Sequence, residues 1–195
     1  MEKMKTATVV EKELGGQKLV LESGMMARQA HGAATVRYGD TVVLVTVLAA
    51  PSTRDIDFFP LYVDYREMHY AGGKFPGGFF KREGRPTTKE IISARQIDRM
   101  IRPLFADDFN DEVQIQCIVM AADKDYDADV LAMIGGSAAL MLSHAPFRGP
   151  TAAVRVGRAD GELVLFPTYE QRDNSDFNMV VSGRSDGINM IELGG

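Results

Sequence analysis

The sequence lacks the features that mark a secreted, disulfide-bonded or membrane-spanning protein. Its single cysteine, Cys117, lies in the apolar run Val113 to Ala121 and cannot form an intrachain disulfide, which favours a small buried side chain in a reducing compartment. No apolar stretch approaches the ~20 residues that a membrane-spanning helix needs. Residues 1–15 mix charged side chains with short apolar runs, unlike a signal or transit peptide. These absences predict a soluble, cytoplasmic protein with no membrane partner.

Most sequence motifs of well-known catalytic sites are also absent. The chain contains no G-x-G-x-x-G sequence, no phosphate-binding P-loop, no nucleophile elbow and no H-E-x-x-H zinc motif. Its three histidines, His31, His69 and His144, are far apart in the sequence and lack the spacing of metal ligands. The pattern does not favour a catalytic or metal-binding role for any of them.

Four alternating aspartates, Asp123, Asp125, Asp127 and Asp129, have a spacing similar to that of a calcium-binding loop. However, Ala128 occupies the position where such a loop requires glycine, and Ile134 occupies the position of its bidentate glutamate. The sequence therefore favours another role, in which an aspartate caps the helix that follows.

The chain does contain enough apolar sequence for a sizeable core. It has 195 residues, 45% of them hydrophobic, which is typical of a globular protein with one well-buried domain. Alternating and β-branched runs predict strands near residues 6–10, 18–22, 33–37, 41–49, 61–65, 112–122, 151–156, 163–166, 178–182 and 188–193.

Two helices are predicted between these strands. Thr87 and Glu90 have the spacing of a capping box and Pro103 ends the segment, so the first helix is expected at about residues 88–101. The second, at residues 128–143, is apolar, and Gly135 and Gly136 would allow close packing. Many strands with two well-separated helices indicate an α+β fold rather than a repeating βαβ sheet.

The charge of the chain is distributed unevenly. A net charge of −5 argues against a protein that coats nucleic acid with its whole surface. Between Arg66 and Arg102, however, there are nine cations and four anions, so this window carries +5 and the rest of the chain carries −10. A basic region in an acidic chain can focus an anionic ligand onto one place.

A glycine-rich segment in this window places Phe79 and Phe80 next to Lys81, Arg82 and Arg85. Phenylalanine rings stack on unpaired bases at ~1–3 kcal/mol each and neighbouring cations neutralise phosphates, so this composition suits a loop that binds single-stranded nucleic acid. In the alternative interpretation both rings are buried under the loop and only the cations are solvated. Composition alone does not decide between the two.

Arg95, Arg99 and Arg102 form a narrow stripe along the first predicted helix, roughly opposite its apolar face. In the simpler interpretation this stripe is a solvated surface on which Asp98 pairs with Arg102, an i,i+4 contact worth only a few tenths of a kcal/mol. Three arginines against one carboxylate leave an excess of positive charge, which favours contacts with phosphates.

Two sequences in this window, FFKREGRP (residues 79–86) and KEIISARQIDRMIRPLF (residues 89–105), closely resemble the signature of bacterial-type polynucleotide phosphorylases, in the first of their two RNase PH-like cores. Further stretches agree with the same family, namely LESGMMARQA (21–30), YGDTV (38–42), DFFPL (57–61), YAGGKFPG (70–77) and AMIGGSAAL (132–140). The resemblance covers nearly the whole chain.

The resemblance implies an RNase PH-like α+β core of mixed or antiparallel strands packed with helices, in ribosomal-protein-like βαβα topology. It implies that the full protein is a polyribonucleotide nucleotidyltransferase, a 3′–5′ phosphorolytic exoribonuclease that uses inorganic phosphate and Mg2+ to release nucleoside diphosphates from RNA, reversibly. Such proteins act in mRNA degradation as homotrimers whose paired cores enclose a channel. The partners implied are single-stranded RNA, the second core, further copies of the chain and other RNA-degradation proteins.

The same resemblance assigns the RNA-binding residues. The loop of Phe79, Phe80, Lys81, Arg82 and Arg85 would line the constriction of the channel, where the rings stack on bases. Lys81 replaces a commoner arginine, which keeps the charge but loses the flat bidentate group. The helix stripe would hold the RNA backbone and consists of Arg95, Arg99 and Arg102.

Catalysis is expected outside this chain. In the family the second core carries a serine-rich phosphate loop and a magnesium-binding group of two aspartates and a lysine. The corresponding positions here hold Asp127 to Val130, which would repel phosphate, and Arg172, Asn178 and Val180. We therefore expect no catalytic residue, metal or cofactor in this chain.

Residues 1–195 are accordingly interpreted as the first, N-terminal RNase PH-like domain of a longer two-core enzyme, inactive alone, which threads RNA and completes the ring. The alternative is a purely structural and oligomerisation domain without direct RNA contact.

Overall fold

Ten strands, three α-helices and two short 3-10 turns are defined within residues 7–53 and 57–194, the parts that the computed structural model describes. The strands are β1 (Thr8–Leu14), β2 (Gln17–Ser23), β3 (Gly32–Tyr38), β4 (Thr41–Ala50), β5 (Leu61–Glu67), β6 (Glu112–Ala121), β7 (Ala152–Ala159), β8 (Glu162–Leu165), β9 (Asn178–Arg184) and β10 (Gly187–Gly194). The helices are α1 (Thr88–Ile101), α2 (Asp129–Met141) and α3 (Tyr169–Asp173), with 3-10 turns η1 (His69–Gly72) and η2 (Arg102–Leu104).

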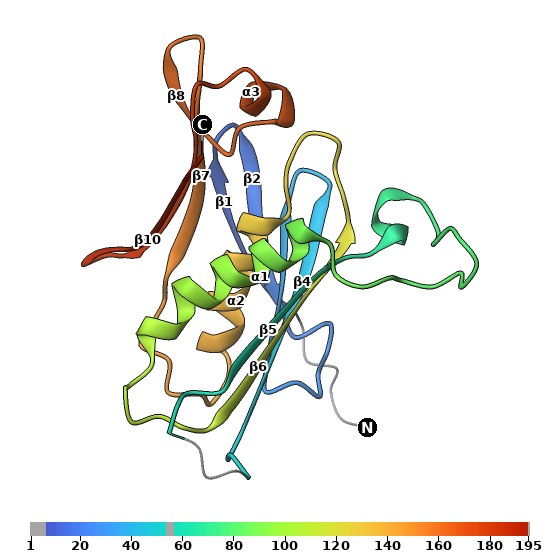
Figure 1. Ribbon diagram of the computed structural model, residues 1–195. Coiled ribbons are helices and arrows are strands. Elements are labelled where there is room, and N and C mark those ends of the chain that lie inside the picture. The colour runs from blue at the N-terminus through green and yellow to red at the C-terminus, as the bar shows by residue number, and fades with distance from the viewer. Residues whose placement is uncertain (1–6, 54–56, 195) are drawn as a thin grey trace.

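Two sheets enclose the long helices α1 and α2 (Figure 1). The larger sheet has the strand order β1-β2-β3-β4-β6-β5, and the smaller has the order β10-β9-β7-β8. All neighbouring strands are antiparallel except β5 and β6, which are parallel and connected through α1. The order β5-α1-β6-α2 confirms the predicted βαβα arrangement and the α+β class.

Helix α1 begins and ends where the sequence predicts. The Thr87 hydroxyl accepts the Glu90 N–H at 3.2 Å, and the Glu90 carboxylate accepts the Thr87 N–H at 2.6 Å, so both bonds of the capping box form. Ile97, Met100 and Ile101 are fully buried against the sheet and α2. The opposite face of α1 is therefore the one available to solvent.

Helix α2 lies in the centre of the core. Gly135 permits its close approach to the larger sheet, because a Cβ atom at this position would lie 2.6 Å from a Val45 methyl group. The predicted aspartate cap is wrong, because the N-cap residue of α2 is Ala128, which has no side-chain cap bond. Asp127 and Asp129 lie on either side of it and use their carboxylates in ion pairs instead.

The remaining elements differ from the prediction mainly at their ends. The first predicted strand, residues 6–10, starts outside the described residues, and β1 continues to Leu14. Helix α3 was not predicted, although Thr168 and Gln171 form a capping box at its start. Cys117 is fully buried, as predicted. Within the described ranges, no helix combines the length and apolar character needed to cross a bilayer.

Candidate nucleic-acid interface

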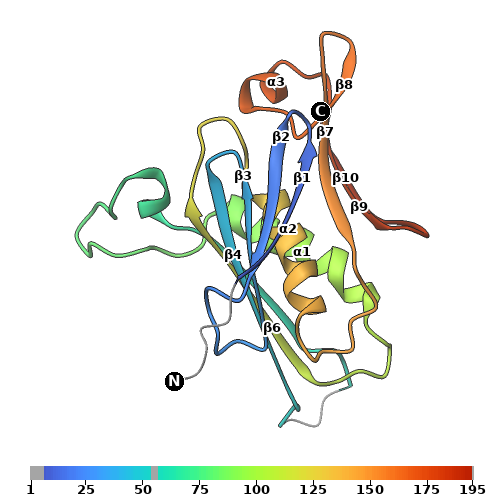
Figure 2. The ribbon, with the colours of Figure 1, turned by 180° about the vertical axis from the view of Figure 1, so that it is seen from behind.

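A projecting loop connects η1 to α1 and stands away from both sheets (Figures 1 and 2). We call residues 73–86 the arm. Phe79 and Phe80 at its tip are 94% and 74% exposed. The interpretation in which these rings are buried is therefore wrong, and the arm presents two aromatic surfaces to solvent. Leaving such large apolar side chains exposed costs stability unless they have a partner to bind.

The aromatic and cationic groups of the arm contact one another. The Phe79 and Phe80 rings meet edge to face with centroids 5.5 Å apart, and the Arg82 guanidinium lies 5.2 Å from the centre of the Phe80 ring. Within the described part of the chain, Lys81 and Arg85 have no ion pair or side-chain hydrogen bond. The arm thus carries unmatched positive charge beside exposed rings.

A third aromatic residue of the arm was missed by the sequence reasoning. Phe75 is 83% exposed and lies on the same projecting segment, before Pro76. The signal was present, because a lone phenylalanine in a glycine-rich segment has neither a strand nor a helix that would bury it.

The three arginines of the predicted stripe, two on α1 and Arg102 at the start of η2, have different environments. Arg95 makes no ion pair or hydrogen bond to another described residue and lines a groove of about 440 Å3 between α1 and β5. Arg99 pairs with Glu192 of β10. Arg102 binds the Asp98 carboxylate with two nitrogens and donates to the Phe59 carbonyl at 2.9 Å. The hydrogen bonds that Arg102 donates to Asp98 raise the pKa of Arg102 above its ordinary value.

The predicted stripe therefore does not act as one surface. Arg95 is free to meet an external anion, whereas the other two guanidiniums already have carboxylate partners within the chain. The Asp98–Arg102 pair is the one that the simpler interpretation anticipated. Which of these arginines contact RNA stays a prediction.

A cavity of about 550 Å3 lies beneath the arm. Residues from both ends of the arm line it, together with the start of α1 and the segment before α2. Its charged lining is mixed in sign and includes Arg66, Glu67, Lys74, Glu83, Arg85, Lys89, Glu90 and Asp127.

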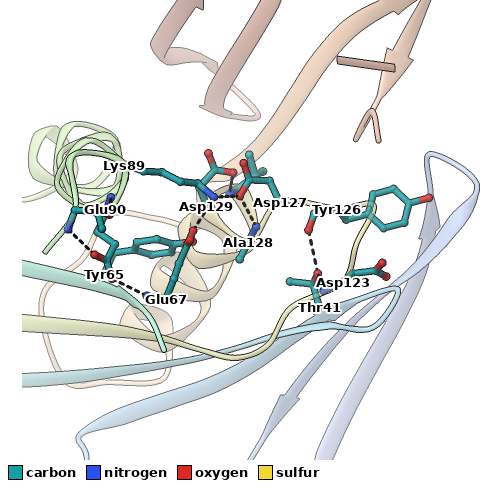
Figure 3. Close-up of polar contacts among 12 residues, drawn as sticks. Thr41, Tyr65, Glu67, Lys89, Glu90, Asp123, Tyr126, Asp127, Ala128 and Asp129 are labelled. Atoms are coloured by element: carbon teal, nitrogen blue, oxygen red, sulfur yellow. Dashed lines mark hydrogen bonds and ion pairs between the residues drawn. The ribbon is translucent and has the colours of Figure 1, made fainter. Parts of the chain in front are cut away.

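Side chains from four elements form an ionic cluster at the floor of this cavity (Figure 3). Lys89 Nζ lies 2.8 Å from Glu67 Oε1 and 2.9 Å from Asp127 Oδ1. Tyr65 donates its hydroxyl hydrogen to the same Glu67 oxygen at 2.8 Å. Arg172 of α3 reaches the second Asp127 oxygen at 3.0 Å. The cluster connects β5, α1, the start of α2 and α3.

Proton affinities in the cluster follow these pairings. Burial alone would lower the pKa of Lys89, but attraction to Asp127 and Glu67 outweighs it and raises that pKa. Burial alone would raise the pKa of Asp127, but Lys89 and Arg172 hold it below its ordinary value. Burial, with help from Glu67, raises the pKa of Tyr65. At neutral pH the lysine and aspartate are therefore charged and the tyrosine is not.

A second, more deeply buried pair extends the cluster. Arg155 of β7 binds Asp129, and their side chains are only 10% and 7% exposed. Arg155 also donates to the Asn178 side chain at 2.6 Å. Burial and the neighbouring Asp127 raise the pKa of Asp129, while Arg155 opposes that rise. The pair links α2 to the smaller sheet.

The positions that the resemblance matched to a catalytic group of the second core lie around this cluster. Arg172 contacts Asp127, Asn178 contacts Arg155, and Val180 is buried in the core. Throughout the described ranges, no group of three or more histidine, cysteine, aspartate or glutamate side chains is arranged to hold a metal ion. The residues present form ion pairs and do not fit a magnesium or phosphate site.

Comparison with models of known protein families identifies the family of this chain. The sequence matches the model described as the 3′ exoribonuclease family, domain 1, over residues 15–146, and the model of domain 2 of the same family over residues 149–195. The chain belongs to the 3′ exoribonuclease family. This confirms the RNase PH-like core predicted from the sequence motifs.

Similar members of the 3′ exoribonuclease family are bacterial proteins. The polyribonucleotide nucleotidyltransferases of Bacillus cytotoxicus and Bacillus cereus are 54% and 53% identical to this chain over 182 residues. Each match covers 93% of this chain and 26% of the relative. The chain thus spans about a quarter of the length of the curated relatives it matches. The resemblance to polynucleotide phosphorylases is confirmed.

Two solved structures share the fold of this chain at low sequence identity. Rice (Oryza sativa) Rrp46 superposes with a TM-score of 0.68 at 17% identity, covering 99% of this chain and 82% of that one. A chain of the Archaeoglobus fulgidus exosome with RNA bound to the active site gives a TM-score of 0.65 at 18% identity, covering 98% and 78%. At these identities the likeness supports the fold.

Proposed function

We propose that this chain is the RNA-threading core of a 3′–5′ phosphorolytic exoribonuclease, a polyribonucleotide nucleotidyltransferase. The observation that carries the proposal is the arm, where Phe79 and Phe80 are exposed beside cations without a carboxylate partner among the described residues. Membership of the 3′ exoribonuclease family and the relatives named polyribonucleotide nucleotidyltransferase support the same conclusion.

The arm would grip a single strand by stacking and charge. Each ring offers a face to an unpaired base, and stacking tolerates any base because every base has a π-face. Lys81, Arg82 and Arg85 would neutralise the adjacent phosphates. Phe75 adds a third exposed ring on the same segment, so the arm has room for more than one base.

On α1, Arg95 is the arginine best placed to bind a phosphate. It is exposed and has no carboxylate partner among the described residues. Arg99 would have to exchange Glu192 for a phosphate, and Arg102 would have to give up two hydrogen bonds to Asp98. We therefore assign backbone contact mainly to Arg95, with Arg99 second and Arg102 chiefly structural.

Phosphorolysis itself would take place on another core of the full protein. Inorganic phosphate and Mg2+ supply the attacking group and its charge neutralisation in such a reaction, but Asp127 and Asp129 repel phosphate and are already paired with cations here. This chain would bind and orient the strand and take part in a cytoplasmic homotrimer. Other RNA-degradation proteins are the further partners proposed.

The second candidate is a structural and oligomerisation domain. One observation favours it, because Ile91 and Ile92 on α1 are each half exposed and Tyr62 lies near them on β5. Apolar groups on the outer face of a helix beside an edge strand suit contact with another protein surface. In this case the α1 arginines would contact a partner core.

Replacing Phe79 and Phe80 together with alanine tests the proposed function. Loss of stacking should weaken binding of a short single-stranded RNA by at least about tenfold, with little change in salt dependence, because counterion release is retained. Fluorescence anisotropy over a salt series measures both quantities. Phe58→Ala is the matched control, since Phe58 is also exposed but lies between β4 and β5. An unchanged affinity in the double variant would refute RNA threading by the arm.

A charge reversal separates the two candidates. In the full enzyme, Arg95→Glu with Arg99→Glu should weaken RNA binding while the trimer stays intact, because phosphate contacts are lost. If analytical ultracentrifugation instead shows dissociation, and the remaining rings bind RNA normally, the oligomerisation role is favoured.

A further inference from the structure

Few specific interactions hold the tip of the arm. From Phe75 to Arg82, within the described structure, the side-chain hydrogen bonds, ion pairs and ring contacts are those among Phe79, Phe80 and Arg82 themselves. A Cβ atom added at Gly77 or Gly78 would have no heavy atom within 4 Å beyond the neighbouring residues. The direction in which the rings point therefore depends on how the ends of the arm are fixed.

Glu83 joins these two ends. One of its carboxylate oxygens accepts the backbone N–H of His69 at 3.0 Å, and the other lies 2.6 Å from His69 Nδ1. The hydrogen bond to His69 also lowers the pKa of Glu83, so the carboxylate is ionised at neutral pH. Beside this contact, Arg66 of β5 donates to the Gly84 carbonyl at 2.7 Å.

Both ends of the arm adjoin segments that are hydrogen-bonded to the rest of the domain. The Ala71 carbonyl in η1 accepts the N–H of Ala122, which follows β6, at 3.0 Å. On the other side, the Glu90 side chain accepts the N–H of Glu67 at 2.9 Å, which fastens the start of α1 to β5. The contact between His69 and Glu83 therefore joins two segments that are each already held to the rest of the domain by hydrogen bonds.

We propose that His69 and Glu83 form a clasp that sets the position of the Phe79 and Phe80 rings for stacking on RNA. The proposal rests on the proposed function of the arm. Both residues act as positioning residues, since they lie at the base of the arm and not at its tip. No motif of the sequence singled out either residue for this role.

The physical reason is conformational entropy. The segment between the clasped residues contains four glycines, Gly72, Gly73, Gly77 and Gly78, so it has wide backbone freedom. With the ends held together, the rings occupy a restricted region, and RNA binding does not have to order the arm from a broad ensemble. When the contact between His69 and Glu83 is broken, RNA binding must also order the arm before the same stacking contacts can form.

This role differs from ordinary stabilisation. An exposed pair such as His69 with Glu83 contributes little to the global free energy of unfolding. The effect of breaking it should therefore appear in the mobility of the arm and in RNA affinity, while the unfolding transition of the whole chain stays where it was.

Trypsin and RNA binding together test the clasp in the 195-residue chain. Lys74, Lys81 and Arg82 make the arm a trypsin substrate whose cleavage reports its mobility. Glu83→Ala should raise the initial rate of cleavage within the arm and weaken binding of a short single-stranded RNA by about 3- to 10-fold, with an unchanged urea midpoint. Glu162→Ala, on the exposed β8 hairpin, is the control.

The conservative variant Glu83→Gln sharpens the result. Its side-chain carbonyl can still accept the His69 N–H, so it should recover part of the affinity that Glu83→Ala loses. His69→Ala removes the ring contact but keeps the backbone N–H, and it should also give an intermediate loss.

The outcomes distinguish the clasp from the proposed function. If Phe79→Ala with Phe80→Ala leaves RNA affinity unchanged, the arm does not bind RNA and both proposals fall. If that double variant loses affinity but Glu83→Ala binds RNA as the unmodified protein does, the clasp is refuted and RNA threading stands. Faster cleavage without any loss of affinity also refutes the clasp, because the rings would then need no fixed position.

Discussion

The arm and the ionic cluster lie close together but differ in whether their cations have carboxylate partners. In the cluster and its extension, the cations Lys89, Arg155 and Arg172 all face a carboxylate of Asp127 or Asp129. In the arm, Lys81 and Arg85 have no carboxylate partner among the described residues. Inside the basic window of residues 66–102, carboxylate partners are also found for Lys89, Arg99 and Arg102. The difference teaches that this window overstates the charge that a ligand can meet.

Burial explains the difference for Arg155 and Arg172. A charge removed from water needs a partner because its desolvation is costly, and the side chains of these two arginines are only 10% and 26% exposed. Lys89 is 46% exposed, and it is paired because Glu67 and Asp127 lie 2.8 and 2.9 Å from its ammonium group. A cation on the surface keeps its hydration and does not need a partner. Cations left unpaired on a projecting segment are therefore those that remain available for an external polyanion, and Arg95 shares this property on α1.

The largest effect is expected from breaking the buried pair. Arg155→Met leaves Asp129 without its cation in a nearly dry environment and should lower the free energy of unfolding by about 3–5 kcal/mol. Arg158→Met is the matched control on the same strand, since Arg158 pairs with Asp176 at the surface and should cost under about 1 kcal/mol. Urea denaturation of both variants measures the contrast, and equal losses would contradict it.

Arg95 on α1 and Arg102 on the adjoining η2 test the comparison between two neighbouring arginines. Arg95→Ala should weaken RNA binding by about three- to tenfold and leave stability unchanged, because it removes a phosphate contact and no internal bond. Arg102→Ala should leave RNA affinity unchanged and cost about 1 kcal/mol of stability, because it removes hydrogen bonds to Asp98 and Phe59. Binding and unfolding measurements on both variants give the answer, and a reversed pattern would overturn the assignment.

Phe75 is a smaller test of the arm. Phe75→Ala should weaken binding of single-stranded RNA by about fivefold, near the lower limit for loss of one stacked base, without altering the unfolding midpoint. Phe58→Ala serves again as the exposed control. If Phe75→Ala and Phe58→Ala bind RNA equally well, stacking of bases on the arm is limited to Phe79 and Phe80.

The smallest expected effect is in the acid range. Backbone N–H groups of Thr87 and Glu67 outweigh burial and lower the pKa of Glu90 below its ordinary 4.5. A lowered carboxyl pKa contributes stability above pH 4.5 that is lost as pH falls through the lowered value. Glu90→Gln should therefore show a shallower loss of stability on acidification than the unmodified protein. Urea midpoints measured between about pH 3 and pH 7 would reveal it, and parallel curves would argue against it.

Local signals made much of the fold predictable. Thr87, Glu90 and Pro103 fixed both ends of α1, because capping and termination depend on residues close in sequence. The strands were predictable for the same reason, because the alternation of apolar side chains also depends on residues close in sequence. Helix α3 was not predicted because it is too short to show a periodicity, and its capping box is its only local signal.

The site depended more on contacts between distant residues. The pairing of Arg99 with Glu192 joins residues 93 positions apart, and no pattern within α1 announces it. Asp127 and Asp129 do not cap α2 because cations from α1, α3 and β7 reach them. Exposure of the Phe79 ring depends on whether the arm folds over the body, which composition leaves open.

The arm lies inside the crossover that connects two parallel strands, β5 and β6. The register of those strands is set by their own pairing and by the packing of α1, so it does not depend on how many residues the connection contains. The segment between η1 and α1 can therefore change length or composition while the scaffold stays the same. This makes the segment a practical graft site for testing other candidate nucleic-acid-binding loops.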